Sequence, residues 1–254
     1  MIIYKTHGIT TGEEWFNFHQ PNLLPRLDIF QAIQMQNIPL NVRKPQSFYT
    51  IIIDLEQDVT NLIEACNETT RYEIKHANSD NNLVYIYNDS NVEIEKFASF
   101  YNEFAKAKSL LPININKLKA YSRAGNLLLT KSVSAENNIT LVYHAYYYSK
   151  DRVRLLNSAS LYRETADRQK RKQIGMANRW LHWQDILYFK QQGINIYDFG
   201  SWYNGTSDKE KTYINQFKEG FGGKIIQGYN YQKGLTIKGK LYLLIKKLYD
   251  FIRH

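Results

Sequence analysis

The sequence has a single cysteine, Cys66, among its 254 residues. One cysteine excludes an intramolecular disulfide and a cysteine-based zinc site, which suits a reducing compartment. No stretch approaches the ~18 apolar residues that a membrane span requires, and the N-terminus lacks the basic-then-apolar pattern of a signal peptide. Internal repeats and low-complexity segments are also missing. We therefore expect an ordered cytoplasmic protein.

Proline is scarce, with five residues, and four of them precede residue 46. Because proline interrupts both helices and central strands, this clustering predicts an irregular segment over residues 1–47.

The charge is strongly unbalanced, with 33 Lys and Arg against 24 Asp and Glu and a net charge of +9. This predicts an attraction for anions without identifying the anion, so that nucleotide phosphates, tRNA, anionic lipid and coenzyme A all remain open. The 20 tyrosines fit half-buried strand positions or a stacking surface for single-stranded nucleic acid. They are scattered through the chain and form no recognisable stacking motif.

From residue 48 onward, patterns typical of strands and helices succeed one another. We expect strands over residues 48–55, 83–87, 126–133, 139–148, 152–158, 194–199 and 224–231. We expect helices over residues 58–67, 97–104, 115–123, 173–192, 209–219 and 238–254. The strands from 126 to 158 follow one another across short turns and predict an antiparallel meander. The expected fold class is α/β, a mixed sheet of this meander plus a parallel strand, flanked by helices.

A basic segment precedes the helix predicted over residues 173–192. Lys172, Gly175 and Ala177 occur where a strand is expected to give way to this helix. Free backbone amides at a helix N-terminus bind phosphate, and a glycine permits close approach. The alternative is a solvated basic face.

Three segments in order, over residues 175–183, 197–200 and 215–223 (GMANRWLHW, YDFG and NQFKEGFGG), resemble signatures of Fem-type transferases of the GNAT superfamily. The segment over residues 71–77 is similar to the arginine-rich helix of that family. Two positions depart from the pattern: Lys172 stands where glutamine or arginine is usual, and Ser201 replaces a second glycine.

The resemblance implies a GNAT-like domain over residues 80–232, preceded by an extension over 1–79 that forms at most a truncated second GNAT-like half. Residues 233–254 would form a basic amphipathic C-terminal helix, which either docks on its own domain or rests on an anionic membrane. In GNAT folds an amide of the fourth strand polarises the acyl carbonyl, which indicates Leu155 to Asn157. The residues implied in binding the carrier are Leu155, Asn157, Lys172, Gln173, Gly175, Met176, Ala177 and Asn178.

Acyl transfer needs a base for the acceptor amine, and several residues are candidates. Asp198 comes first, because the resemblance places an acidic residue there, and a structural cap is the alternative. Glu164, His144 and Tyr203 are further catalytic candidates, while Trp202 and Lys218 are candidates for binding substrate. Trp180, His182 and Trp183 are interpreted as core.

We therefore expect an N-acyltransferase without a metal that moves an acyl or aminoacyl group from a carrier to an amine by direct attack. The expected carrier is an acyl-CoA. The expected acceptor is an amino sugar or a cell-envelope or polysaccharide precursor, either a small molecule or lipid-linked. An aminoacyl-tRNA-dependent transferase of the peptidoglycan type and a catalytically inert GNAT-like binding module are the alternatives. The sequence does not determine the oligomeric state.

Overall fold

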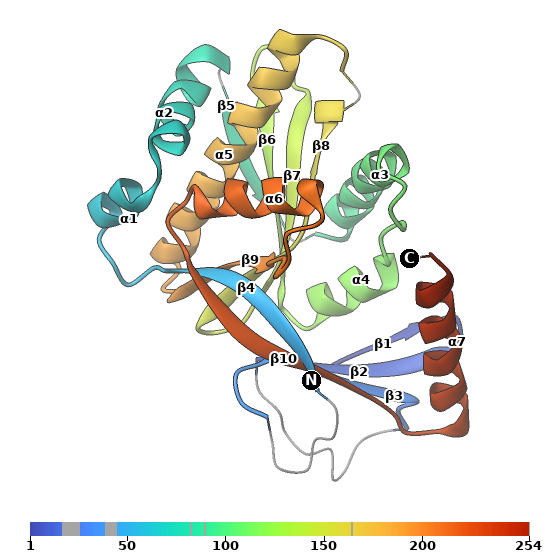
Figure 1. The fold of residues 1–254 in the computed structure, drawn as a ribbon. Helices are drawn as coiled ribbons and strands as arrows, with labels where there is room; N and C mark the ends of the chain where they lie inside the picture. Colours follow the sequence, from blue (N-terminus) through green and yellow to red (C-terminus); the bar gives the residue numbers. More distant parts are fainter. Residues whose placement is uncertain (17–25, 39–44, 82, 89, 164, 254) are drawn as a thin grey trace. The chain divides into compact units, whose positions relative to one another are not determined.

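The computed structural model describes residues 1–16, 26–38, 45–81, 83–88, 90–163 and 165–253 (Figure 1). The chain forms two compact units, one of residues 50–226 and the other of residues 1–49 together with 227–254. The sequence suggested boundaries after residues 79 and 232, and the two units divide elsewhere. The helices over residues 59–81 pack within the larger unit, so that unit begins before residue 80. No helix in the described part of the chain has the length and apolar character needed to cross a membrane.

The smaller unit contains strands where the sequence predicted irregular structure. Its elements are β1 (Ile2–Thr6), β2 (Ile9–Trp15), β3 (Ile29–Met35), most of β10 (Lys224–Gly234) and α7 (Ile237–Arg253). β1 and β2 form an antiparallel hairpin, β2 pairs with β3 in parallel, and β3 pairs with β10 in antiparallel orientation. The prediction of an irregular segment over residues 1–47 is therefore wrong, since the prolines precede or follow these strands and do not interrupt them.

The larger unit follows the predicted alternation closely. Its strands are most of β4 (Gln46–Asp54), β5 (Leu83–Asn88), β6 (Leu127–Ser134), β7 (Thr140–Tyr148), β8 (Arg152–Ser160) and β9 (Ile196–Ser201). Its helices are α1 (Val59–Ala65), α2 (Glu68–Asn81), α3 (Asn91–Ala107), α4 (Ile115–Arg123), α5 (Arg168–Gln191) and α6 (Lys209–Glu219), with a 3-10 turn, η1, at Leu161–Arg163.

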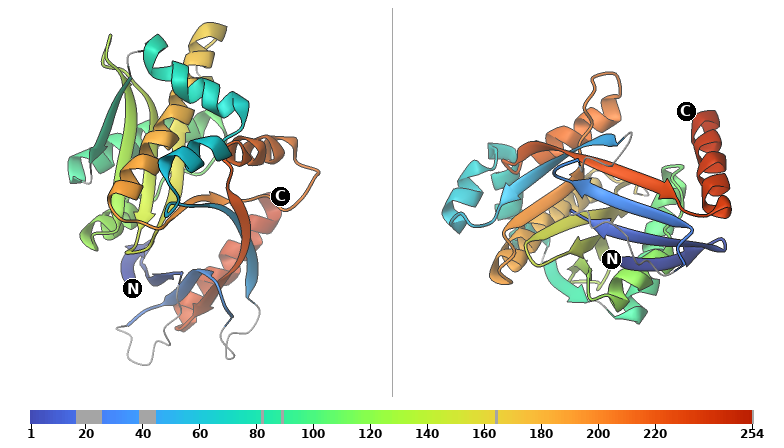
Figure 2. Two further views of the ribbon diagram at one scale, coloured as in Figure 1. Left: turned by 90° about the vertical axis from the view of Figure 1, so that its left-hand side faces the viewer. Right: turned by 90° about the horizontal axis from the view of Figure 1, so that it is seen from below.

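Within this unit the sheet order is β4-β9-β8-β7-β6-β5, in which β8 and β9 are parallel and the other pairs antiparallel. The predicted mixed sheet with an antiparallel meander and one parallel strand pair is confirmed. α2 and α5 cover one face of this sheet and α3 and α4 the other (Figures 1 and 2).

The central strand β7 is buried on both faces, so alternate side chains enter opposite layers. Tyr143 contacts Phe97 of α3 on one face, whereas His144 and Tyr146 reach Asp185 of α5 on the other. The alternation of this strand therefore directs a histidine and a tyrosine toward the same buried carboxylate.

Candidate active site

β8 and β9 separate after a short stretch of pairing. Their parallel register covers Arg152 with Ile196, Val153 with Tyr197, and Arg154 with Asp198. At the same level β8 has a bulge, because Tyr146 and Ala145 of β7 pair with Leu155 and Asn157 and leave Leu156 unpaired. A bulge bends its strand, so β8 turns away from β9 and exposes backbone groups along that edge.

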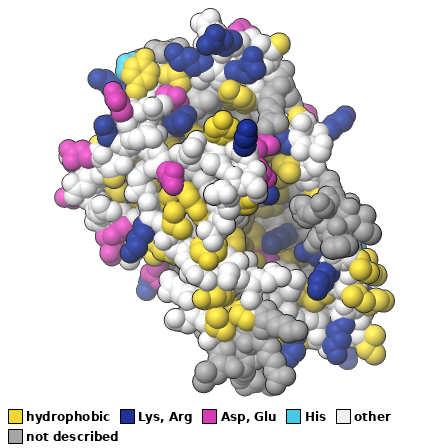
Figure 3. Space-filling view, viewed as in Figure 1, with side chains coloured by type: hydrophobic (Ala, Val, Ile, Leu, Met, Phe, Trp, Pro, Cys, Tyr) yellow, Lys and Arg dark blue, Asp and Glu magenta, His cyan; other side chains and the backbone are white. Residues whose placement is uncertain are grey.

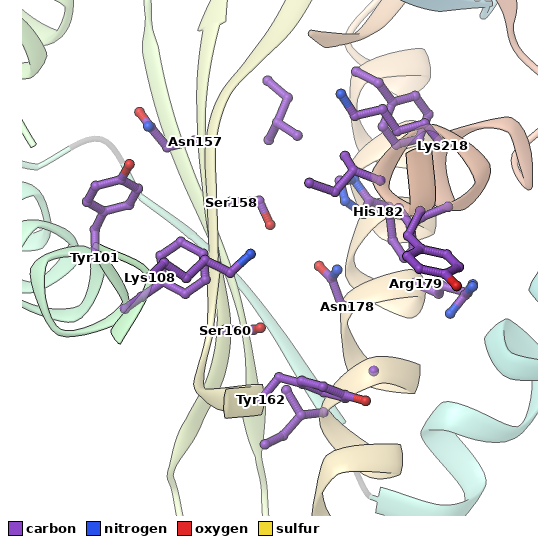
Figure 4. A pocket seen from close by; sticks show the side chains of 18 of the residues that line it. Tyr101, Lys108, Asn157, Ser158, Ser160, Tyr162, Asn178, Arg179, His182 and Lys218 are labelled. Carbon is purple, nitrogen blue, oxygen red and sulfur yellow. The ribbon is translucent and has the colours of Figure 1, made fainter. Parts of the chain in front are cut away.

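A cavity of about 810 Å³ lies at this edge, between the end of β8 and helices α3, α5 and α6. Figure 4 shows polar side chains directed into it from each of these elements. They include Tyr101, Lys108, Asn157, Ser158, Ser160, Asn178, Arg179, His182 and Lys218. The volume is in the range of sites for small molecules and cofactors.

The cationic side chains of the cavity differ in their partners. Lys108 forms an ion pair with Glu210 at 3.1 Å, and Arg179 forms one with Glu73 at 2.7 Å. Lys218 is buried and donates to the carbonyl oxygen of Ser201, and no carboxylate of the described residues forms an ion pair with it. Burial, assisted by the positive charge of Arg154, lowers the pKa of Lys218 to about 8. Its charge is therefore sensitive to pH near neutrality.

His182 connects the cavity to a buried chain of hydrogen bonds. Its Nδ1 lies 2.8 Å from the Tyr197 hydroxyl, which lies 2.7 Å from the Tyr146 hydroxyl. Tyr146 in turn donates to Oδ2 of Asp185 at 2.6 Å.

The acceptor at the end of this chain fixes the direction of its protons. Tyr146 donates its hydroxyl proton to Asp185. Because each hydroxyl has only one proton, Tyr197 donates to Tyr146, and Nδ1 of His182 donates to Tyr197. Nε2 of His182 is then an unprotonated acceptor, and it makes no hydrogen bond with the described residues. Burial, followed by electrostatic interactions with His144, Lys218 and Arg179, lowers the pKa of His182 well below its usual value and keeps the ring neutral.

Burial and the Asp185 carboxylate also raise the pKa values of Tyr146 and Tyr197 well above the usual value, so both remain protonated.

A second branch of hydrogen bonds starts from the Asp185 carboxylate, since Nδ1 of His144 lies 2.8 Å from Asp185 and its Nε2 lies 3.0 Å from Oδ1 of Asn178.

His144, His182 and Asp185 bring ligand-type atoms within 4.8 Å of one another. The Nδ1 atoms of both histidines are engaged, however, in the hydrogen bonds just described. The arrangement therefore fits a proton-relay network better than a metal centre.

Several residues expected at the site line the cavity. They are Leu155, Asn157, Gly175, Asn178 and Lys218. Lys172, Gln173, Met176 and Ala177 do not line it, and Met176 and Ala177 are buried in the core between α5 and the sheet.

The expected phosphate loop over residues 172–177 lies inside α5, which begins at Arg168. The amides of this segment donate to carbonyls of the preceding turn, so they are not free to bind phosphate. At the true N-terminus of the helix, the amides of Gln169 and Lys170 donate to the Asp167 carboxylate, which caps the helix. The interpretation of residues 172–177 as an anion-binding loop is therefore wrong in the position of the helix start.

Asp198, the first candidate base, is fully buried and does not line the cavity. Its carboxylate accepts from Arg152, from the Thr50 hydroxyl and from the amide of Gly200. With these partners the carboxylate holds β4, β8 and β9 together, and the geometry does not present it to a substrate.

His144, Tyr203 and Trp202 do not line the cavity either. His144 is fully buried behind Asn178. The Tyr203 hydroxyl lies 2.9 Å from the Ser207 hydroxyl, and Trp202 is partly buried against the hydrophobic core of the larger unit. Glu164 lies outside the described residues.

The residues that sequence reasoning missed are His182 with its relay partners Tyr197, Tyr146 and Asp185. His182 was interpreted as core beside two tryptophans. The signal that could have marked it is the spacing of His182 and Asp185, which places both on one face of α5.

Comparison with solved structures identifies the fold. FemX superposes with a TM-score of 0.56 at 14% identity, over 78% of this chain and 63% of that chain. The C-terminal domain of a putative lysylphosphatidylglycerol synthetase from Agrobacterium fabrum gives a TM-score of 0.55 at 11% identity, over 85% of this chain and 70% of that one.

The structure of L-PGS from Bacillus licheniformis gives a TM-score of 0.54 at 12% identity, over 86% of this chain and 71% of that chain. No protein-family model and no curated protein sequence matches the chain. The chain thus has a Fem-like GNAT fold, as its sequence signatures indicated, and it spans less than two thirds of the length of FemX.

Proposed function

We propose that this Fem-like GNAT fold transfers an acyl or aminoacyl group from an ester- or thioester-linked carrier to an amine. One observation supports this above all: β8 and β9 separate at a bulge, and the open edge of β8 borders a polar cavity that contains His182 and Lys218. Such an edge offers backbone amides to a carbonyl, which is the requirement of acyl transfer.

His182 is the proposed base. The acceptor nitrogen attacks the acyl carbon, a C–N bond forms, and the C–O or C–S bond to the carrier breaks. The amine proton passes to Nε2 of His182, which then returns a proton to the departing oxygen or sulfur. During this step the Nδ1 proton remains hydrogen-bonded to Tyr197, so the relay fixes the tautomer and orientation of the ring.

The negative charge that develops on the carbonyl oxygen requires stabilisation. A backbone amide at the β8 bulge, among Leu155 to Asn157, is suited to donate to this oxygen. The ammonium group of Lys218 supplies positive charge in a partly dehydrated setting, where a charge acts more strongly than in water.

The donor is either an acyl-CoA or an aminoacyl-tRNA. The sequence favoured acyl-CoA because a phosphate-binding loop was expected at Gly175. Gly175 instead lies inside α5, whose N-terminus is capped by Asp167, so this reason for preferring acyl-CoA no longer holds. The Fem-type resemblance and the net charge of +9 support an aminoacyl-tRNA as much as coenzyme A. The proposed acceptor is an amine of an amino sugar or of a lipid-linked cell-envelope precursor.

An assay with two donor series tests the proposal. The protein is incubated with amino-sugar acceptors and either acyl-CoA or a pool of charged tRNA, and thiol release and transfer of labelled amino acid are measured. We expect the wild-type protein to turn over with one donor series. His182→Asn should lose this turnover, and His7→Asn should keep it. His7 is an exposed residue with a φ of 50°, where asparagine fits, and it serves as the control.

The rival is an inert GNAT-like module that binds an anionic polymer or a partner protein. Binding of RNA that weakens with salt, with no turnover in either donor series, would establish the rival and refute the proposed activity.

A further inference from the structure

Helix α7 of the smaller unit carries a stripe of apolar side chains that is exposed to solvent. Ile237, Leu241, Leu244, Ile245 and Leu248 are 86%, 56%, 56%, 57% and 54% exposed. Monomeric proteins rarely leave a contiguous row of large aliphatic side chains uncovered. This stripe therefore points to an interaction surface.

The stripe faces away from the part of the protein on which α7 packs. At about 100° per residue, its five positions fall on one side of the helix. Gly239 lies about half a turn away and is buried so closely that an added Cβ would collide with the carbonyl of Asp28. Leu243, also on that inner side, is half-buried. Packing within the unit thus uses the inner side and leaves the aliphatic stripe free.

Lysines flank this stripe. Residues 237–249 contain Lys238, Lys240, Lys246 and Lys247 and no acidic residue. On the helix, Lys238 lies along one border of the stripe, and Lys240 and Lys247 lie along the other. Lys238 also donates to the carbonyl of Gly8 and lies 3.8 Å from Asp28, while Lys240, Lys246 and Lys247 are exposed. In Figure 3, hydrophobic and basic side chains are interleaved along the edge where Figure 1 draws α7.

We propose that α7 binds the surface of an anionic lipid bilayer, with its aliphatic stripe inserted among the acyl chains and its lysines at the headgroups. An apolar face bordered by lysines fits such a surface, because the apolar side chains contact the acyl chains while the lysines contact the anionic headgroups. A second copy of the chain fits less well, because packing stripe against stripe would bring the lysines of the two borders together. This inference is independent of the proposed transfer reaction.

Vesicle co-sedimentation tests the proposal with the full chain. We expect binding to vesicles of phosphatidylcholine mixed with phosphatidylglycerol, weaker binding at high salt, and little binding to phosphatidylcholine alone. Leu244→Ser with Leu248→Ser should weaken binding by about tenfold or more, because each leucine loses its apolar contact with lipid. Lys240→Gln with Lys247→Gln should reduce binding to the anionic vesicles only.

Val92→Ser is the matched control, since Val92 is 67% exposed on α3 and should not affect vesicle binding. Circular dichroism confirms that each variant is folded. Equal binding by the wild type and Leu244→Ser/Leu248→Ser would overturn the proposal, as would absence of binding to anionic vesicles. A dimer in sedimentation that the same double variant dissociates would assign the stripe to a second copy instead.

Discussion

Nδ1 of His182 lies 2.8 Å from the hydroxyl oxygen of Tyr197, which connects a cavity-lining imidazole to the buried Asp185 through two tyrosines. The bond orients the ring and leaves Nε2 as its unprotonated nitrogen. The chemistry proposed for the cavity depends on this arrangement more than on any other.

Replacement of His182 by asparagine should reduce kcat by about 10²-fold or more, the usual contribution of a general base, with a smaller effect on KM. The measurement is steady-state kinetics with the donor that supports turnover. Thermal unfolding followed by circular dichroism shows whether the variant is folded. Loss of kcat in a folded protein, with His7→Asn unaffected, supports the role, and an unchanged kcat would exclude it.

Deprotonation of Lys218 should lower kcat at alkaline pH. Its pKa is lowered to about 8, so the fraction that carries a positive charge declines as pH rises through that value. If the charge stabilises the reacting oxyanion, kcat should decrease by about tenfold per pH unit above this pKa. Lys218→Arg should move this decrease out of the measurable range, because arginine keeps its charge.

The control for Lys218 is Lys209→Met, at an exposed position of the same helix, which should leave the pH profile unchanged. A profile with the same alkaline decrease in Lys218→Arg would show that another group titrates.

The elements that could be predicted from the sequence are those whose own residue pattern determines them. The meander over β6, β7 and β8 followed from runs of strand-forming residues separated by short turns. The helix over Ile115–Arg123 followed from its helical spacing of apolar residues. The start of α5 did not, because Arg168 to Lys172 are polar and give no apolar period. Asp167 was the available signal, as a typical N-cap residue.

The relay could not be predicted in the same way. Tyr146, His182 and Tyr197 come from a strand, a helix and another strand, and their contacts depend on the packing of α5 across the sheet. Periodicity assigned His182 correctly to a buried face. It could not show that this face opens on a cavity where β8 bends away from β9.

Asp198→Asn tests the structural role that the geometry assigns to this carboxylate. The substitution removes the carboxylate charge that pairs with the buried Arg152 guanidinium, so we expect the free energy of unfolding to fall by about 3–5 kcal/mol. Urea denaturation provides the measurement. Asp151→Asn, at an exposed residue next to β8, should change little. Full stability combined with loss of kcat would instead favour Asp198 as the base.

Gly175→Ala distinguishes the helix from the expected phosphate loop. Gly175 lies within α5, where an added Cβ would approach only the Tyr162 ring at 4.0 Å. Alanine should therefore stabilise the protein by up to about 1 kcal/mol and leave donor KM nearly unchanged. In a loop that holds phosphate closely, the same change would raise KM strongly.

Gly222 provides a matched control, because alanine at this position is expected to lower the stability of the protein. Gly222 has a φ of 78°, and a Cβ there would collide with the carbonyl of Ala65, so Gly222→Ala should destabilise the protein. Thermal unfolding of the two variants side by side measures this contrast. Destabilisation by Gly175→Ala of similar size would contradict the helical placement.

The most direct test is a crystal structure with a non-transferable analogue of whichever donor supports turnover. We predict that its acyl carbonyl oxygen lies within hydrogen-bond distance of a β8 amide between Leu155 and Asn157, in the cavity that contains His182 and Lys218. An analogue bound at another surface, with this cavity empty at saturating concentration, would contradict the account.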